Sequence, residues 1–341
     1  MSTTITRKQF LVGAAAAVGA AGLVPRSSAR AAGRRYVIKF GVDLPADHPT
    51  TQHLSAAAEQ IKSASKGDVE VQVFPSNQLG DDTHMLANVR AGAIQMMGIG
   101  DNILATLVPS AAIDNIGFAF KDSKTAWSAL DGAVGEIVRP DIEKVGLYPM
   151  PRIWDEGFRE ITSSTKPIKT ADDLHGFKIR VPPSPISLSL FKSLGAAAVT
   201  LNVAELYTAL QTHVVDGQEN PLSVIETQKF YQVQKYCSLS NHMWVGYWLI
   251  VNGDFWKGMP ADYQKIVSDA FDTQALSQRT ASESLNGSLQ SKLTSQGLTF
   301  VTPETGSFRE ALVKSGFYKT WQDKFGPPLW SALEKYSGAL G

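Results

Sequence analysis

The sequence GFKIRVPP, at residues 176–183, predicts a buried strand that ends beside a charged side chain. Phe177, Ile179 and Val181 alternate along it. Arg180 therefore points to the opposite face, and the two prolines that follow cannot continue a sheet ladder. Ligands of α/β proteins bind at such strand ends, and a guanidinium beside an apolar core matches a carboxylate. The stretch predicts an α/β fold with an anion-binding group at a strand end.

Strand and helix patterns alternate along the chain around this stretch. In the first half, we expect strands at residues 36–42, 69–73 and 93–99, and helices at residues 50–66 and 81–91. A second unit has strands at residues 148–154, 177–181, 198–201 and 214–215, and helices at residues 185–194 and 202–211. Asn202 and Glu205 match a capping box. The alternation predicts a mainly parallel sheet with helices on both faces.

Residues 260–296 predict an unusually long helix. This range has no internal proline and a single glycine, Gly287, and its apolar residues recur at helical spacing. A continuous helix would be about 50 Å long at 1.5 Å per residue, so it would lie across more than one domain. Two helices broken near Gly287 are the alternative, because an interior glycine costs about 1 kcal/mol. No low-complexity linker is present, so we expect strands to cross between the domains.

The N-terminus predicts export. Arg7 and Lys8 precede an apolar run that stops at Pro25, and residues 29–31 (ARA) match a signal-peptidase site. We therefore expect residues 1–31 to be a signal peptide, either of the twin-arginine type with lysine in the second basic position or of the ordinary secretory type. The run is short for a membrane span.

Composition limits the class of protein further. Residues 1–31 contain four basic and no acidic side chains, so their removal changes the formal charge from +0 to −4. A weakly acidic chain argues against a nucleic-acid partner. The single cysteine, Cys237, excludes an internal disulfide and a cysteine metal site. The length, at about 100–200 residues per domain, predicts two domains.

Enzyme signatures are absent from the sequence. It has no Gly-x-Ser-x-Gly elbow and no phosphate loop, and its six histidines lack metal-ligand spacing. Gly98 and Gly100 follow a predicted strand, but Ile103 stands where a dinucleotide turn needs its third glycine. We therefore expect no cofactor, no metal and no catalytic residues.

Polar and aromatic residues gather where predicted strands end. Asp43 ends the first strand, residues 154–159 close another, and residues 218–221 follow a third. Asn220 precedes a proline, which favours an extended backbone and lets its amide project. Each residue alone also fits a structural role, for example Arg159 on the surface or Trp154 in the core. Together they predict a concave anion site.

Five stretches, in this order and at these spacings, resemble one family. They are FPSNQLGD at residues 74–81, GFR at 157–159, GFKIRVP at 176–182, ELYTALQ at 205–211 and VDGQENP at 215–221. The chain resembles the DctP-type solute-binding proteins of tripartite ATP-independent periplasmic (TRAP) transporters, from residue 40 to about residue 330.

The resemblance implies an α/β, type II-like periplasmic binding protein with hinge strands and one long helix spanning both domains. We place domain I at residues 32–156 plus 246–285, and domain II at residues 157–245 plus 286–341. The predicted helix over residues 260–296 agrees with this architecture.

The resemblance also implies site roles. Arg180 matches the arginine that takes the ligand carboxylate in a two-pronged salt bridge, Arg159 the second arginine beside it, and Asn220 the amide that supports the same carboxylate. Such a pair is directional, and it strengthens as the domains close and exclude water. The ligand would select the closed state, which the membrane subunits recognise.

Departures from the family bear on the ligand. In the sialic-acid branch an Asn stands at the position of Asp43 and an acidic residue at that of Gly100, which argues against sialic acid here. Trp154, Trp244 and Tyr247 offer flat apolar walls.

Two acids add hydrogen-bonding capacity. Asp43 and Asp101 can accept hydrogen bonds from hydroxyls, so we expect a hydroxylated carboxylate, either a sugar acid or an aromatic hydroxy acid.

The sequence thus predicts a periplasmic, non-enzymatic carrier that binds one small organic acid and delivers it to the small and large TRAP membrane subunits. One alternative is a periplasmic enzyme acting on such acids through Asp43, Asp101, Asp155 or Glu156. The other is a ligand sensor that uses the same pocket to signal to a receptor.

Overall fold

The computed structural model describes residues 35–341 and is organised around one mixed β-sheet. The predicted signal peptide lies outside the described residues. The sheet has the strand order β2-β1-β3-β9-β5-β8-β6-β7, and β4 and β10 both pair with β9. The strands are β1 (Tyr36–Gly41), β2 (Val69–Phe74), β3 (Met96–Gly100), β4 (Leu147–Pro149), β5 (Trp154–Ser163), β6 (Lys178–Val181), β7 (Ala197–Thr200), β8 (Gly217–Asn220), β9 (Tyr236–Asn252) and β10 (Thr299–Val301).

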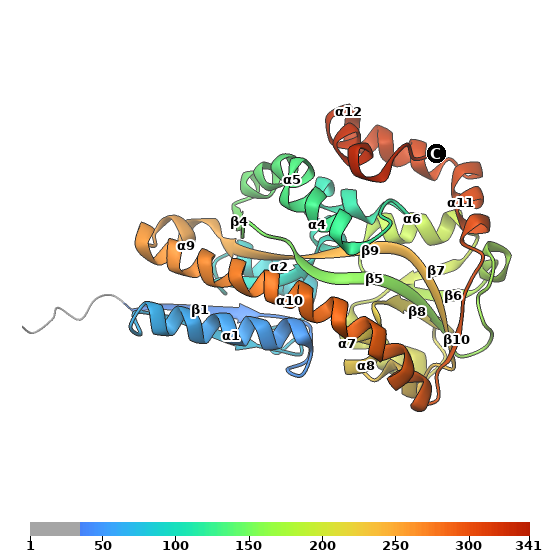
Figure 1. Ribbon diagram of the computed structural model, residues 1–341, viewed down its shortest axis with the longest axis horizontal. Coiled ribbons are helices and arrows are strands. Elements are labelled where there is room, and N and C mark those ends of the chain that lie inside the picture. Colours follow the sequence, from blue (N-terminus) through green and yellow to red (C-terminus); the bar gives the residue numbers. More distant parts are fainter. Residues whose placement is uncertain (1–34) are drawn as a thin grey trace, which may run out of the picture. The chain divides into compact units, whose positions relative to one another are not determined.

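The two central strands give the sheet its mixed character. β1 is parallel to β2 and β3, and β6 is parallel to β7 and β8. Between these two parallel groups, β5 and β9 are antiparallel to each other, β9 is antiparallel to β3, and β5 is antiparallel to β8. The expectation of a mainly parallel sheet is therefore correct at both ends of the sheet and wrong at its centre. The two central strands connect the two parallel groups of strands (Figure 1).

β9 connects the two parallel groups because it pairs along most of its length. It pairs with β5 from Tyr236 to Tyr247 and with β3 from Tyr247 to Val251. Its side chains are buried on both faces: Tyr247, Leu249 and Val251 belong to one hydrophobic cluster, while Trp248 belongs to the other. A strand buried on both faces has no polar alternation to reveal it in a sequence.

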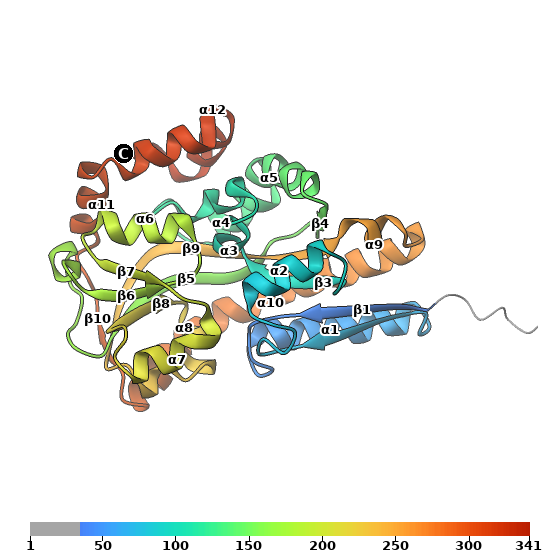
Figure 2. The same ribbon diagram turned by 180° about the vertical axis from the view of Figure 1, so that it is seen from behind.

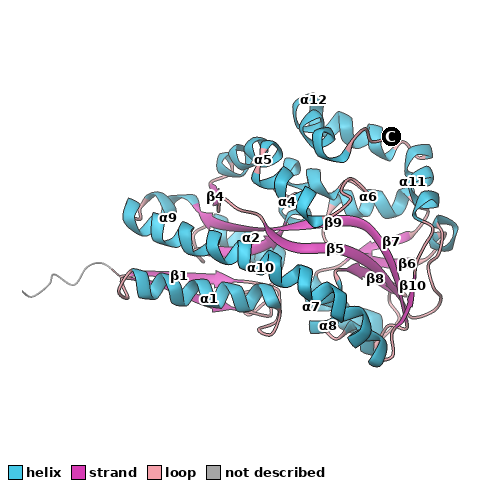
Figure 3. Ribbon diagram, in the orientation of Figure 1, coloured by secondary structure: helices cyan, strands magenta, loops and turns pink. Residues whose placement is uncertain are grey.

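Helices cover both faces of the sheet, as predicted (Figures 2 and 3). One face is covered by α1 (Pro49–Ala64), α7 (Val203–Gln211), α8 (Leu222–Thr227) and α10 (Ala261–Ser295). The hydrophobic cluster on the other face includes residues of α2 (Asp82–Arg90), α3 (Asp101–Leu104), α4 (Ser123–Asp131), α5 (Ala133–Lys144), α6 (Pro185–Ser193), α11 (Thr305–Lys314) and α12 (Phe317–Ser337). Each of the two cores therefore extends across both parallel groups.

α10 is one continuous helix of 35 residues, which confirms the long helix and excludes the alternative of two helices broken near Gly287. It contacts α1 beside the first parallel group, and α8 and β10 beside the second. Gln278 joins its middle to β5: the Asp155 N–H donates to Oε1 of Gln278 at 3.1 Å, and Nε2 of Gln278 donates to the Asp155 carbonyl at 2.7 Å. Figure 1 shows α10 crossing the molecule in front of β5.

Three local predictions differ from the structure. The strand expected at residues 148–154 is interrupted after β4, because Pro151 cannot donate to a ladder. Residues 214–215 do not form a strand, and the polar residues 217–220 form β8 instead. Asn202 precedes α7 but makes no capping hydrogen bond with its side chain. Residues 35–341 form a single unit, so the domain limits stay a prediction.

Candidate functional site

A small pocket lies where the two parallel groups of strands meet the central pair. Its volume is about 20 Å³, close to the roughly 10–15 Å³ that one water molecule needs. A ligand with several carbon atoms therefore enters only when the walls move apart. The pocket is lined by Asp43, Asp82, Gly100, Asn102, Ile103, Glu156, Arg159, Arg180, Pro182, Val203, Asn220, Val224 and Tyr247.

Arg180 reaches the pocket from β6, because its neighbours Ile179 and Val181 lie in the core. It is 1% exposed, and its Nε donates to the Leu201 carbonyl at 2.8 Å. Within residues 35–341, no carboxylate lies within ion-pair distance of its guanidinium. Burial lowers the pKa of Arg180 to about 10. Arg180 is thus a buried cation without an acidic partner, which a bound anion would stabilise.

Arg159, on β5, has a different environment. Its guanidinium forms a two-pronged ion pair with Glu219, with Nε 2.5 Å from Oε2 and Nη2 3.1 Å from Oε1. Nη2 also donates to Oδ1 of Asn220 at 2.9 Å, and Nη1 lies 3.5 Å from Oε1 of Glu156. Burial opposes the charge of Arg159, but the two glutamates outweigh it and raise the pKa of Arg159. Arg159 therefore forms ion pairs within the protein, whereas Arg180 forms none with the described residues.

Glu219 continues this ion pair into a buried polar network. Burial disfavours its charge, but Arg159 and a hydrogen bond with His242 outweigh burial and lower the pKa of Glu219 to about 2. Nε2 of His242 lies 3.2 Å from Oε2 of Glu219, and its Nδ1 lies 2.8 Å from Oγ of Ser240. This network orients the guanidinium of Arg159 through Glu219, so the orientation of Arg159 does not depend on a ligand.

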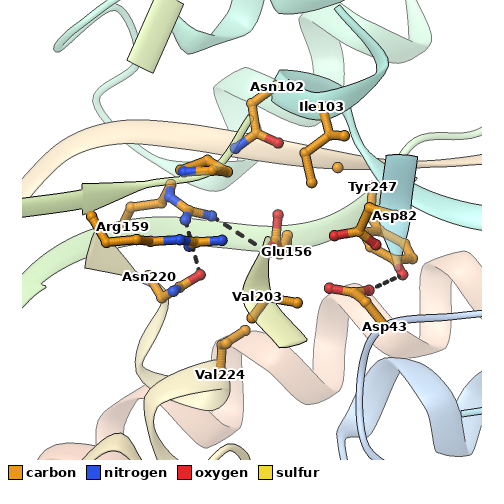
Figure 4. A pocket seen from close by; sticks show the side chains of 13 residues that line it. Asp43, Asp82, Asn102, Ile103, Glu156, Arg159, Val203, Asn220, Val224 and Tyr247 are labelled. Atoms are coloured by element: carbon orange, nitrogen blue, oxygen red, sulfur yellow. Dashed lines mark hydrogen bonds and ion pairs between the residues drawn. The ribbon is translucent and has the colours of Figure 1, made fainter. Parts of the chain in front are cut away.

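The other end of the pocket is acidic (Figure 4). Asp43 accepts a hydrogen bond from the Tyr247 hydroxyl at 2.7 Å. Asp82, the first residue of α2, is 1% exposed, and neither of its carboxyl oxygens has a hydrogen-bond partner in the described part of the chain. Burial raises the pKa of Asp43, raises that of Asp82 well above its usual range, and raises that of Glu156 to about 8. Figure 4 shows Glu156 between the acidic end and Arg159.

A bulge in β5 aims Glu156 at the pocket. The register with β9 shifts between Asp155 and Gly157, which leaves Glu156 as the extra residue of the strand. Gly157 has φ +113°, a conformation that side chains rarely allow. This local geometry explains why GFR at residues 157–159 begins with glycine.

Five of the eight residues predicted for the site line the pocket. They are Arg180, Arg159, Asn220, Asp43 and Tyr247. The other three, Asp101, Trp154 and Trp244, lie in the interior outside the lining. Asp101 accepts hydrogen bonds from Gly246 N and from Asn115, Trp154 belongs to one hydrophobic cluster, and Nε1 of Trp244 donates to Asp155 at 2.9 Å.

Sequence analysis missed several lining residues, above all Asp82. It follows Asp81, which caps α2, and an acid in the first turn of a helix usually has that ordinary role. Glu156 lies in the strand-end stretch 154–159 that predicts an anion site, but the sequence gives it a named role only in the enzyme alternative. The apolar lining residues Ile103, Val203 and Val224 carry no signal that separates them from core residues.

Residues 35–341 have neither a membrane-spanning helix nor a cluster of metal ligands. None of their helices has the length and apolar character needed to cross a membrane. No group of three or more histidine, cysteine, aspartate or glutamate side chains within them is arranged to hold a metal ion.

Comparison with known protein families shows to which family the chain belongs. Residues 40–318 match the profile of DctP, the bacterial extracellular solute-binding proteins of family 7. The chain belongs to this family. The resemblance inferred from the five sequence stretches is thereby confirmed.

Individual DctP relatives extend the match. The 2,3-diketo-L-gulonate-binding periplasmic protein YiaO of Escherichia coli is 34% identical over 68% of this chain and 71% of its own length. The C4-dicarboxylate-binding periplasmic protein DctP of Rhodobacter capsulatus is 35% identical over 72% of this chain and 74% of its own. The crystal structure of the sugar acid binding protein DctPAm from Advenella mimigardefordensis, in complex with galactonate, superposes with a TM-score of 0.85 at 30% identity, covering 89% of this chain and 98% of that one.

These matches establish the class of protein. It is a periplasmic solute-binding protein of the TRAP type, with the mixed α/β fold and long helix of that group, and it binds small organic acids. The DctP family consists of solute-binding proteins rather than enzymes.

Proposed function

We propose that this DctP protein binds a hydroxylated monocarboxylate, a sugar acid, in the pocket between its strand groups and delivers it to the membrane subunits of a TRAP transporter. The observation that carries this proposal is the buried guanidinium of Arg180, which has no acidic partner among residues 35–341. Its Nη1 and Nη2 would hold the ligand carboxylate in a two-pronged salt bridge.

Arg159 and Asn220 support the same role as a fixed second layer. Because Glu219 already pairs with Nε and Nη2 of Arg159, only Nη1 can turn toward a ligand without breaking that ion pair. Asn220 accepts from Arg159 and donates to Gln218, so its amide is oriented before a ligand arrives. Pre-ordered donors lose little conformational entropy on binding.

The remaining lining favours a sugar acid over an aromatic hydroxy acid. Tyr247 is the only aromatic residue among the lining residues of the described chain, because Trp154 and Trp244 lie outside the pocket. The acids Asp43, Asp82 and Glu156 suit a ligand with several hydroxyl donors. The related protein DctPAm was solved with galactonate, which has this chemistry.

Domain closure would connect binding to delivery. The pocket volume of about 20 Å³ is too small to contain a six-carbon acid, so the walls must separate to admit the ligand and close on it around a wider space than in this structure. A ligand that contacts both strand groups would stabilise the closed form, and the TRAP membrane subunits would recognise that form.

Thermal unfolding and calorimetry with a panel of aldonates, beginning with D-galactonate, test the proposal. An aldonate at about 100 times its dissociation constant should raise the free energy of unfolding by about 2.7 kcal/mol. Galactitol, which has the same carbon chain without the carboxylate, is the control and should produce no shift. Equal stabilisation by galactitol would refute the carboxylate site, and chemical conversion of a bound aldonate would favour the enzyme alternative. Delivery is tested by asking whether proteoliposomes with the membrane subunits need this protein for uptake.

A further inference from the structure

Three carboxyl groups from separate elements line the pocket. Asp43 and Asp82 lie at the end opposite Arg159, and Glu156 lies between that end and Arg159 (Figure 4). Asp43 follows β1, Asp82 begins α2, and Glu156 occupies the bulge of β5. The Asp82 residue is 1% exposed and the Glu156 side chain 9% exposed. Grouping three acids where water is largely excluded is unfavourable unless a ligand or protons compensate for it.

The protein itself provides little compensation at this end. Neither Asp43 nor Asp82 forms an ion pair with any residue from 35 to 341, and Glu156 has only the 3.5 Å contact with Arg159. Tyr247 donates to Asp43, whereas both oxygens of Asp82 are buried without a hydrogen-bond partner in the described chain. Since Asp82 lines the pocket, its unsatisfied oxygens can be satisfied there by a donor on a ligand.

We propose that Asp82, Asp43 and Glu156 form a second subsite, which binds hydroxyl groups at the far end of the ligand and excludes a second carboxylate. This inference rests on the proposed function, in which Arg180 holds the first carboxylate. The second subsite would favour binding of aldonates, which end in a hydroxymethyl group, over binding of aldarates and C4-dicarboxylates, which end in a second carboxylate.

Hydroxyl groups fit this subsite in every protonation state of the three acids. A hydroxyl donates to an ionised carboxylate and can accept from a protonated carboxyl. Burial raises the pKa of all three acids, and repulsion from neighbouring acids adds to the effect for Asp82 and Glu156. The pKa of Glu156, about 8, leaves this carboxyl protonated near neutral pH, so the ligand meets both donors and acceptors. A second ligand carboxylate can only accept, and where it meets an ionised acid the two charges repel each other in a buried site.

Calorimetry with matched pairs of acids tests the subsite directly. D-galactonate and galactarate differ only at the sixth carbon, and D-erythronate and meso-tartrate differ only at the fourth. We expect the monocarboxylate of at least one pair to bind about tenfold or more tightly than its dicarboxylate. In Asp82→Asn, which keeps the shape but removes one ionisable carboxyl from the group of three, this ratio should fall at least about threefold. Asp172→Asn, an exposed acid outside the pocket, should leave the ratio unchanged.

The outcomes separate the subsite from the proposed function. Equal affinities within every pair, or an unchanged ratio in Asp82→Asn, would overturn the subsite while leaving a sugar-acid carrier intact. Stronger binding of 6-aminohexanoate than of any aldonate would also overturn it, because the acids would then recognise a cation. Failure of every aldonate to bind would overturn the proposed function itself. If Asp82→Asn does not fold, Glu156→Gln provides the same comparison, and the ratios of the unmodified protein already decide the exclusion of dicarboxylates.

Discussion

Arg159 and Glu219 form a two-pronged ion pair in which the residues are 2% and 0% exposed, respectively. Arg180 lines the same pocket and is equally buried, but it has no such partner within residues 35–341. The two guanidinium groups therefore differ in what stabilises their charge. Arg159 has a carboxylate in direct contact, whereas within residues 35–341 Arg180 feels Glu219, Asp82 and Asp43 only at longer range, and burial lowers its pKa to about 10. This difference predicts opposite effects on stability: loss of the Glu219 charge should destabilise the protein, and loss of the Arg180 charge should not.

Glu219→Gln should strongly destabilise the protein. The substitution removes the negative charge from Arg159 and leaves a buried cation poorly compensated, which typically reduces the free energy of unfolding by about 3–5 kcal/mol. Urea denaturation measures the effect. The control is Glu226→Gln, which removes an ion pair with the exposed side chain of Lys292 from a half-buried glutamate and should change stability by less than about 1 kcal/mol, because solvent reaches the pair. Similar losses in the two variants would contradict the structural role of Glu219.

Arg180→Met should separate binding from stability. Methionine removes a buried charge that no acidic side chain of residues 35–341 pairs with, so the stability of the ligand-free protein should rise or stay within about 1 kcal/mol. The stabilisation by aldonates should disappear. Arg180→Lys keeps a positive charge without the fork and should bind about tenfold or more weakly than the parent.

Thermal unfolding with and without D-galactonate measures both effects of the Arg180 substitutions. Arg90→Met, an exposed arginine on α2, is the control and should retain the ligand-induced shift. A variant without Arg180 that still responds fully to the aldonate would remove this residue from the site.

The sequence predicts those parts of the fold that have a regular pattern. The alternation around Arg180 places Ile179 and Val181 in the core, and the helical spacing over residues 260–296 predicts α10 nearly to its ends. The same reasoning fails for β9, whose residues 243–251 are apolar on both faces, and for β8, whose residues GQEN resemble a loop although all four are buried. These strands are determined by neighbours that are distant in sequence.

The site was only partly predictable for a related reason. Asp82 and Asp101 are each the first residue of a helix, and both are fully buried, but only Asp82 faces the pocket. The rotation of each helix against the sheet decides this, and that rotation follows from tertiary packing. Trp154 and Trp244 fit a pocket wall and a core equally well in a sequence, and the structure places both in the interior.

Tyr247→Phe should weaken the acidic end of the pocket without changing its shape. Loss of the hydroxyl removes the hydrogen bond to Asp43 and leaves that carboxyl less satisfied, which should lower stability by about 1–3 kcal/mol. Tyr207→Phe removes a hydrogen bond to Gln232 at the surface and is the matched control, with an expected loss below about 1 kcal/mol. Urea denaturation of the two variants should rank them in that order, and the reverse order would show that Asp43 does not need this donor.

The stability of the ligand-free protein should fall as pH rises from 6.5 to 8. Burial raises the pKa of both Glu156 and Glu160 to about 8, from an ordinary value of 4.5. In this interval the folded glutamates keep protons that the unfolded chain has released. The free energy of unfolding therefore decreases with pH, by up to about 1.4 kcal/mol per pH unit for each protonated carboxyl. The stabilisation is complete below pH 4.5 and is lost as pH passes 8.

The interval above pH 6.5 avoids the opposing effect of a buried histidine. Burial lowers the pKa of His48 to about 3, so the contribution of His48 is lost only as pH falls below its ordinary value of 6.5. Thermal or urea unfolding at half-unit steps measures the slope. Glu160→Gln should flatten it, because the amide keeps the acceptor for the Asn241 N–H without titrating. Glu310→Gln, an exposed residue on α11, should leave the slope unchanged. If stability instead increases with pH over this interval, the two glutamates are already ionised in the folded protein. The acidic end of the pocket would then repel even a single carboxylate unless a cation accompanied it.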